Sequence, residues 1–127
     1  MILVDTNIII DFWKQPSEKY KKVFMNEDIA ICGIVIAELI HGAKTEKEIK
    51  KIIEALDCFT FLNISEKDWF EIGKLLNKLK NKGLNFPFQD GVLSYLAIKN
   101  NFAIWTNDKH FDLIQKNIQK LKIYKID

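Results

Sequence analysis

The stretch that decides the fold of this chain is Ile2-Leu3-Val4-Asp5-Thr6-Asn7, a short apolar run that ends in three polar residues. An apolar run of this kind is typical of a strand that is buried on both faces of a parallel sheet. The polar residues that follow favour the start of a helix. Residues 2–7 therefore predict a buried strand that leads directly into a helix, with Asp5 at the junction.

The rest of the chain continues this alternation of strands and helices. Apolar segments predict further strands at about residues 29–32, 59–64, 102–106 and 122–124. Helices are expected from residue 6 to just before Pro16, and at about 18–25, 34–41, 45–56, 65–82, 89–99 and 108–116. This pattern indicates an α/β fold, a parallel-sheet α/β/α sandwich of about five strands with helices on both faces.

Length and composition predict one domain, spanning residues 1–127. The chain is 48% apolar and 28% charged, which is ordinary for a globular protein. No apolar stretch approaches the roughly 20 residues that a membrane span needs, and no targeting segment is apparent, so we expect the cytoplasm and no membrane contact. Cys32 and Cys58 follow no metal-binding spacing and lie in apolar segments, which predicts reduced core residues.

The basic residues of the chain are all lysines, 19 in number, and the formal net charge is +2. If Asp5, Glu38, Asp90 and Asp108 form one site, the rest of the chain carries a formal +6. Such a surface attracts a polyanion. Because lysine lacks the guanidinium fork that reads guanine edges, we expect these side chains to contact phosphates more than bases.

Each of these four acids also has a structural explanation. Asp5 and Asp108, which both follow predicted strands, would serve as helix caps. Asp90 at a helix start is favoured by the helix dipole by about 0.3 to 1 kcal/mol. Glu38 lies in the apolar run Ile-Val-Ile-Ala-Glu-Leu-Ile, where burial of an unpaired carboxylate costs several kcal/mol. It therefore needs a lysine partner or a cation.

The four acids taken together favour a metal site. Ligands bind at the carboxyl ends of parallel strands, so Asp5 and Asp108 are expected at the same sheet edge. Ser94, one turn after Asp90, is small enough to leave room above that carboxylate. Converging carboxylates repel unless a cation compensates them, and oxygen ligands favour Mg²⁺ or Mn²⁺. This arrangement suits phosphodiester hydrolysis.

The two histidines are not expected to be catalytic. His41 falls near the end of a predicted helix and is interpreted as a surface residue. His110 is interpreted as a loop residue or one beside the substrate. For neither histidine does the sequence indicate a nearby acid that would orient it as a general base.

The sequence resembles the PIN-domain family in four fragments that occur in order: Asp5-Thr6-Asn7, Ala37-Glu38-Leu39-x-x-Gly42-Ala43, Asp90, and Thr106-x-Asp108-x-x-Phe111. The resemblance is greatest to the VapC-type toxins of prokaryotic toxin-antitoxin modules and spans nearly the whole chain. It implies a Mg²⁺-dependent endoribonuclease, usually a homodimer, that a cognate antitoxin holds inactive by covering the acidic pocket.

Carried over residue by residue, the resemblance implies that Asp5, Asp90 and Asp108 are direct or water-mediated metal ligands. Glu38 is then the fourth acid, which holds a metal-bound water, and Asn7 and Thr106 orient the site. The sequence departs from the family's pattern at Gly91, where alanine is more common, and at Asn107, where a basic residue is common.

Two alternatives stay open at this stage. One is a PIN nuclease of RNA processing or DNA repair outside any toxin module, which the absence of a short upstream antitoxin gene would indicate. The other is a non-catalytic α/β module, such as a receiver-like domain, whose acids bind a metal or a partner. A receiver would show an acidic pair soon after its first strand, and the sequence offers no clear match to that pair.

Overall fold

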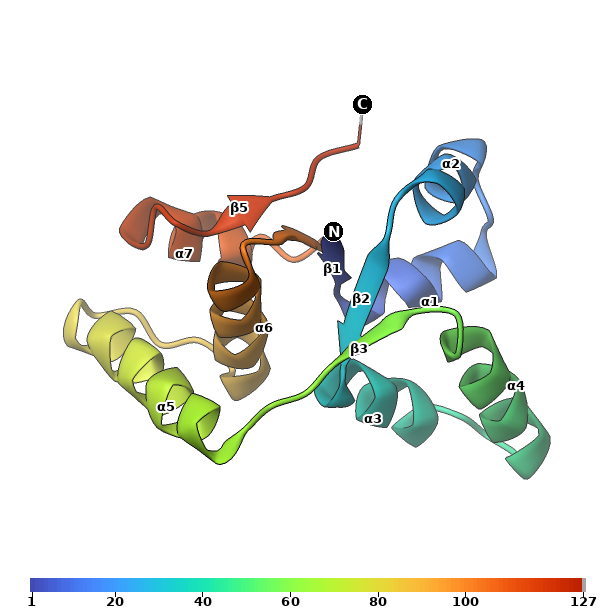
Figure 1. Cartoon of the computed structure of the whole chain (residues 1–127), viewed down its shortest axis with the longest axis horizontal. Coiled ribbons are helices and arrows are strands. Elements are labelled where there is room, and N and C mark those ends of the chain that lie inside the picture. Colours follow the sequence, from blue (N-terminus) through green and yellow to red (C-terminus); the bar gives the residue numbers. More distant parts are fainter. Residues whose placement is uncertain (127) are drawn as a thin grey trace.

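The computed structural model describes residues 1–126, and in these residues a five-stranded sheet forms the centre of the molecule (Figure 1). The strands are β1 (Ile2–Val4), β2 (Ile29–Cys32), β3 (Thr60–Leu62), β4 (Ala103–Trp105) and β5 (Lys122–Ile123). Their order is β3-β2-β1-β4-β5, and each neighbouring pair is parallel. The predicted parallel α/β fold is therefore confirmed.

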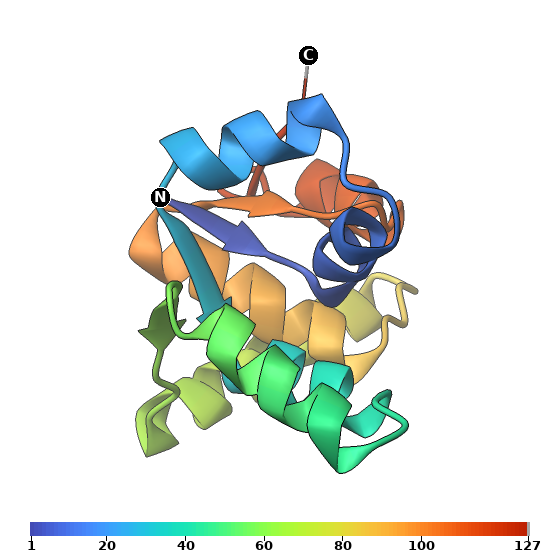
Figure 2. The ribbon, with the colours of Figure 1, turned by 90° about the vertical axis from the view of Figure 1, so that its right-hand side faces the viewer.

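Seven helices connect these strands within the described residues: α1 (Thr6–Lys14), α2 (Glu18–Asn26), α3 (Gly33–His41), α4 (Glu46–Leu56), α5 (Glu66–Asn81), α6 (Phe88–Asn100) and α7 (His110–Asn117). Figure 2 shows α2 above strands β1 and β4 and α6 below them, so helices cover both faces of the sheet. None of the helices in the described part is both long and apolar enough to cross a membrane.

The core is centred on β1, which pairs with β2 on one side and β4 on the other. Leu3 and Val4 are completely buried, as are Ala30 and Cys32 of β2. Burying a side chain such as Leu3 stabilises the fold by roughly 1.5 to 3 kcal/mol. Because β1 is held on both edges and both faces, the position of Asp5 directly after it is fixed by the rigid centre of the molecule.

A buried polar network joins α5 to α6, the helix that carries Asp90. A capping box of Ser65 and Asp68 begins α5, with Ser65 N donating to Asp68 Oδ2 at 2.8 Å. Asp68 Oδ1 also accepts from Lys99 Nζ at 2.7 Å and from Tyr95 Oη at 2.8 Å. These donors, led by Lys99, hold the pKa of Asp68 well below its usual range, while burial and Asp68 raise the pKa of Tyr95 to about 12.

Several local predictions are wrong. Cys58 is exposed, because it follows the end of α4, where its Sγ donates to Ala55 O. The apolar stripes of α4 and α5 are wider than the faces these helices bury, because Ile53 and Trp69 are 55% and 45% exposed. Helix α7 begins at His110 rather than near residue 108, because the residues before it form a turn.

Candidate active site

The four predicted carboxylates line one cavity of about 350 Å³. Asp5 follows β1, Glu38 lies on α3 after β2, Asp90 opens α6, and Asp108 follows β4. Three of these positions come directly after, or in the helix after, parallel neighbouring strands, where carboxyl ends meet at one edge. The fold thus brings together acids that lie as far apart in sequence as Asp5 and Asp108.

Asp5 is the most constrained of these acids. Its Oδ1 accepts from Thr6 N at 2.7 Å, which caps α1, and its Oδ2 accepts from Thr106 Oγ1 at 2.7 Å and Asn7 Nδ2 at 3.2 Å. Only 9% of the residue is exposed. Burial raises the pKa of Asp5, and the hydrogen bonds oppose that change, while the negative charge of Asp108 adds to it.

Polar residues tie the loop after β4 to the start of α1. Thr106 Oγ1 accepts from Asp108 N at 3.0 Å and from Asn7 Nδ2 at 3.3 Å. Asn107 N donates to Asn7 Oδ1 at 3.0 Å. Asn7 and Thr106 therefore both donate to the Asp5 carboxylate, and Thr106 also accepts from the backbone of Asp108.

Glu38 is positioned differently from what its apolar neighbours suggested. The prediction that it would be buried is wrong, because α3 turns this residue outward and it is exposed at the cavity. Its Oε1 accepts from Thr6 Oγ1 at 3.0 Å, which links it to the residue after Asp5. No lysine pairs with Glu38 among the described ion pairs, so its carboxylate is available to a ligand in the cavity.

The clearest residue that sequence reasoning missed is His110. Its Nδ1 lies 2.9 Å from Asp90 Oδ2 and 3.4 Å from Asp108 Oδ1, and His110 N donates to Asp108 Oδ1 at 2.9 Å. Burial raises the pKa of Asp90, which the hydrogen bond to His110 opposes. Asp108, two residues before His110, was the available signal, because the first turn of α7 brings the two side chains together.

The remaining predicted residues lie outside the cavity lining. Ser94 is completely buried one turn after Asp90 on α6, and its Oγ has no hydrogen-bond partner among the described residues. It does not line the cavity. His41 is exposed at the end of α3, as predicted for a surface residue.

The donor set of this cavity fits a divalent cation. One ligand atom each from Asp90, Asp108 and His110 lies within 4.8 Å of the other two, and the Asp5 and Glu38 carboxylates line the same cavity. Oxygen donors suit Mg²⁺ or Mn²⁺, and an imidazole nitrogen is a better ligand for Mn²⁺ than for Mg²⁺. Burial is the main reason why the pKa values of Asp5 and Asp90 are raised, and the negative charge of Asp108 adds to both changes.

The fold and the cavity together define an α/β protein with an acidic site at the carboxyl edge of its sheet. Residues 2–117 match the family described as the PIN domain, and the chain belongs to this family. It is 30% identical over 124 residues to Ribonuclease VapC1 of Methanocaldococcus jannaschii, covering 97% of this chain and 86% of the relative.

Two further comparisons involve Rickettsia felis. The chain is 32% identical over 114 residues to Ribonuclease VapC2 of that organism, covering 84% of this chain and 85% of the relative. The crystal structure of R. felis VapBC2 bound to a DNA fragment from its promoter contains a chain that is similar over the full length of both, with a TM-score of 0.79 and 27% identity.

Proposed function

We propose that this chain is a divalent-metal-dependent endoribonuclease that hydrolyses RNA phosphodiester bonds and acts as the toxin of a toxin-antitoxin pair. The observation that carries the proposal is the convergence of Asp5, Glu38, Asp90 and Asp108 on one cavity of a PIN domain. Two relatives bear the name ribonuclease.

The chemistry of the cavity divides between a cation and the side chains of the chain. Asp5, Asp90 and Asp108 would hold Mg²⁺ or Mn²⁺, with His110 beside them. Such a cation supplies positive charge next to the scissile phosphate and lowers the pKa of a water molecule. Asn7 and Thr106 keep the carboxylate of Asp5 directed into the site through their hydrogen bonds to Oδ2.

We assign to Glu38 the tasks of orienting the attacking water and accepting its proton. Hydrolysis adds water across one P–O bond, so the water must give up a proton as it attacks phosphorus. Glu38 is exposed at the cavity, and of its two carboxylate oxygens only Oε1 takes a described hydrogen bond. Its second oxygen is therefore free to orient the water and accept that proton.

The test is cleavage of a pooled RNA by the purified chain. We expect cleavage with Mg²⁺ or Mn²⁺ and none with EDTA, and a loss of at least about a hundredfold in Asp5→Asn. Asp57→Asn is the matched control, since Asp57 is an exposed carboxylate at the end of α4. Cleavage by Asp5→Asn at the wild-type rate would contradict the proposal, and cleavage of DNA in preference to RNA would favour a repair nuclease instead.

The partners follow from the same proposal. A toxin of this kind works in the cytoplasm, pairs with a cognate antitoxin that covers the acidic cavity, and forms a homodimer. The exposed aromatic side chains of Trp69, Phe70 and Phe88 give the chain apolar surface that such assemblies bury.

A short open reading frame upstream whose product co-purifies with the chain and blocks RNA cleavage would separate a toxin from a nuclease of RNA processing. Light scattering of the isolated chain tests the dimer.

A further inference from the structure

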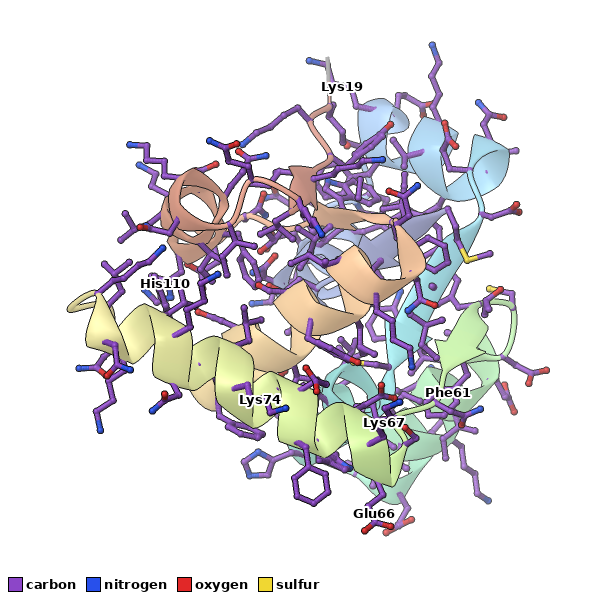
Figure 3. All side chains as sticks on the ribbon, turned by 60° about the vertical axis from the view of Figure 1, so that its left-hand side comes forward. Lys19, Phe61, Glu66, Lys67, Lys74 and His110 are labelled. Atoms are coloured by element: carbon purple, nitrogen blue, oxygen red, sulfur yellow. The ribbon has the colours of Figure 1, made fainter. Side chains whose placement is uncertain are left out.

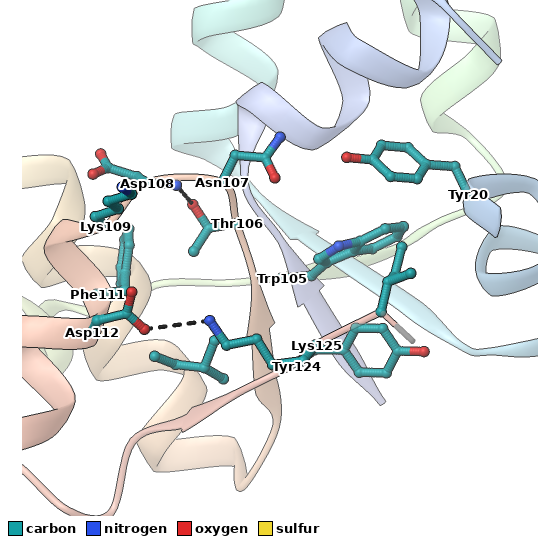
Figure 4. Close-up of a pocket in the computed structure, with 12 residues that line it drawn as sticks. Tyr20, Trp105, Thr106, Asn107, Asp108, Lys109, Phe111, Asp112, Tyr124 and Lys125 are labelled. Carbon is teal, nitrogen blue, oxygen red and sulfur yellow. Dashed lines mark hydrogen bonds and ion pairs between the residues drawn. The ribbon is translucent and has the colours of Figure 1, made fainter. Parts of the chain in front are cut away.

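A second cavity lies on the other side of the loop after β4. Its volume is about 340 Å³, within the range of about 300 to 1,000 Å³ typical of small-molecule sites. Asp108 lines both this cavity and the acidic one. A group bound here is therefore next to the candidate metal site. We call this cavity the aromatic pocket, after Tyr20, Trp105 and Tyr124, which line it (Figure 4).

The three aromatic residues form a cluster with two outer rings and a buried centre. Trp105 is only 3% exposed, and its ring centroid lies 5.2 Å from that of Tyr20 and 5.7 Å from that of Tyr124. Both tyrosine rings meet the indole edge-on, at 65° and 64°. Tyr20 and Tyr124 are half-buried, so each keeps part of its ring accessible, and Figure 4 shows them on opposite sides of Trp105.

Two lysines and two aspartates, Asp108 and Asp112, accompany the aromatic rings. Lys109 and Lys125 both line the pocket and are exposed. Lys125 lies 3.4 Å from Asp112, whereas Lys109 pairs with no carboxylate among the described ion pairs. The lysines that Figure 3 labels on α2 and α5, Lys19, Lys67 and Lys74, lie on the outer surface instead.

Resting on the proposed ribonuclease function, we infer that the aromatic pocket binds one nucleoside of the RNA beside the phosphate that is cleaved. Single-stranded RNA is recognised by stacking of its bases on aromatic side chains and by lysine contacts to its phosphates. The acidic cavity alone repels a polyanion, so the substrate needs additional contacts beside it. The pocket supplies the rings of Tyr20 and Tyr124 for the base and the ammonium group of Lys109 for a flanking phosphate.

Binding of a short RNA oligonucleotide in EDTA tests this inference without catalysis. Tyr124→Ala is expected to raise the dissociation constant about tenfold, and Tyr124→Phe, which keeps the ring, to stay within about twofold of wild type. Lys109→Ala is expected to weaken binding several-fold and to lower the slope of log K against log salt by about one. Phe61→Ala, an exposed aromatic on β3, is the matched control and should bind as wild type does.

Two further measurements complete the test. Adenosine and uridine 5′-monophosphates should shift the indole N–H resonance of Trp105, and Tyr124→Ala should raise KM for RNA with kcat within about twofold. Because the Tyr124 ring packs against Trp105 and its removal also costs stability, Lys109→Ala, on the surface, gives an independent answer.

The outcomes separate this inference from the proposed function. Unchanged binding by Tyr124→Ala and Lys109→Ala, or an indole resonance that neither nucleotide moves, overturns the pocket. If Lys109→Ala weakens RNA binding and Tyr124→Ala does not, the chain contacts a phosphate without stacking on a base, and the inference is again overturned. If RNA cleavage requires Asp5 but is unchanged in Tyr124→Ala, the inference about the aromatic pocket is wrong and the proposed nuclease function stands. If the wild-type chain cleaves no RNA, the proposed function itself is wrong.

Discussion

His110 shows how one residue outside the predicted set can control the site. Its Nδ1 contacts Asp90 and Asp108, which come from α6 and from the loop after β4. Half of its side chain is exposed, so it contacts the two carboxylates from the surface of the molecule (Figure 3). Whether the imidazole binds the cation or only contacts the two carboxylates, it bridges Asp90 and Asp108 and so affects the distance between them.

We expect His110→Ala to weaken Mn²⁺ binding by about tenfold or more, the usual cost of losing a residue that orients metal ligands. Isothermal titration of the metal-free chain with Mn²⁺ measures this directly. His41→Ala is the matched control, because His41 is exposed at the end of α3 and touches none of the four acids. Equal affinities in both variants and wild type would show that His110 takes no part in holding the cation.

At the scale of elements, the contact between α5 and α6 positions Asp90. Asp68 is only 2% exposed, and its accepted hydrogen bonds keep its pKa well below the ordinary value of 3.8. A carboxylate whose pKa is lower in the folded state stabilises the fold above the unfolded pKa, and this contribution is lost as the pH falls below about 4. The network should therefore be fully effective at neutral pH and fail in acid.

Asp68→Asn is accordingly expected to lower Tm at pH 7 by about 5 °C or more. The difference from wild type should shrink as the pH falls towards 3, because the Asp68 carboxylate of the unfolded wild-type chain then takes up a proton while that of the folded chain is still ionised. Thermal unfolding followed by circular dichroism between pH 3 and 7 measures both trends. Tyr95→Phe, which removes one donor and keeps Lys99, should cost less, and a constant difference across this range would count against the linkage.

The elements themselves were largely predictable from the sequence. Apolar runs located β1 and β2 to the residue, since strands buried on both faces carry a continuous signal. The exposed side of α4 and α5 was not predictable, because an apolar stripe does not tell how much of its width another element covers. Gly91 is a related case: a Cβ there would lie 2.6 Å from Leu76, so close approach of α5 and α6 explains a glycine where the family more often has alanine.

The candidate site was predictable where it depends on strand ends and less so where it depends on side-chain direction. Asp5 and Asp108 converge because parallel strands align their carboxyl ends, which the element pattern already indicates. The exposure of Glu38 depends on the rotation of α3, and the contact of His110 with Asp90 depends on how α7 meets α6. Neither follows from spacing along the chain, and the aromatic pocket, built from residues as distant as Tyr20 and Tyr124, left no local signal.

The molecule gathers four of its 17 acidic residues in one cavity. Its 19 lysines leave a small positive net charge, while the predicted site concentrates four carboxylates in one cavity. Burial raises the pKa values of Asp5 and Asp90, and the charge of Asp108 raises both further. Because the unfolded chain releases these protons first, the share of these groups in the free energy of unfolding falls as the pH rises above about 4. The carboxylates proposed to bind the cation therefore lower the free energy of unfolding of the metal-free chain.

Asp108→Asn tests this trade between stability and metal binding. The asparagine Oδ1 can still accept from His110 N, so the turn before α7 keeps its hydrogen bond while the like charge is removed. In EDTA at pH 7.5 the variant is expected to melt about 2 to 4 °C above wild type, with a smaller difference at pH 5.

Saturating Mg²⁺ or Mn²⁺ should reverse that order. The cation stabilises only a chain that binds it, by about 2.7 kcal/mol when its concentration is a hundred times the dissociation constant. Asp57→Asn controls for the change in net charge and should melt as wild type does in both conditions. If Asp108→Asn gains as much from the cation as wild type, then Asp108 is not a ligand. If it melts below wild type in EDTA, then the four acids do not repel one another strongly enough to require a cation.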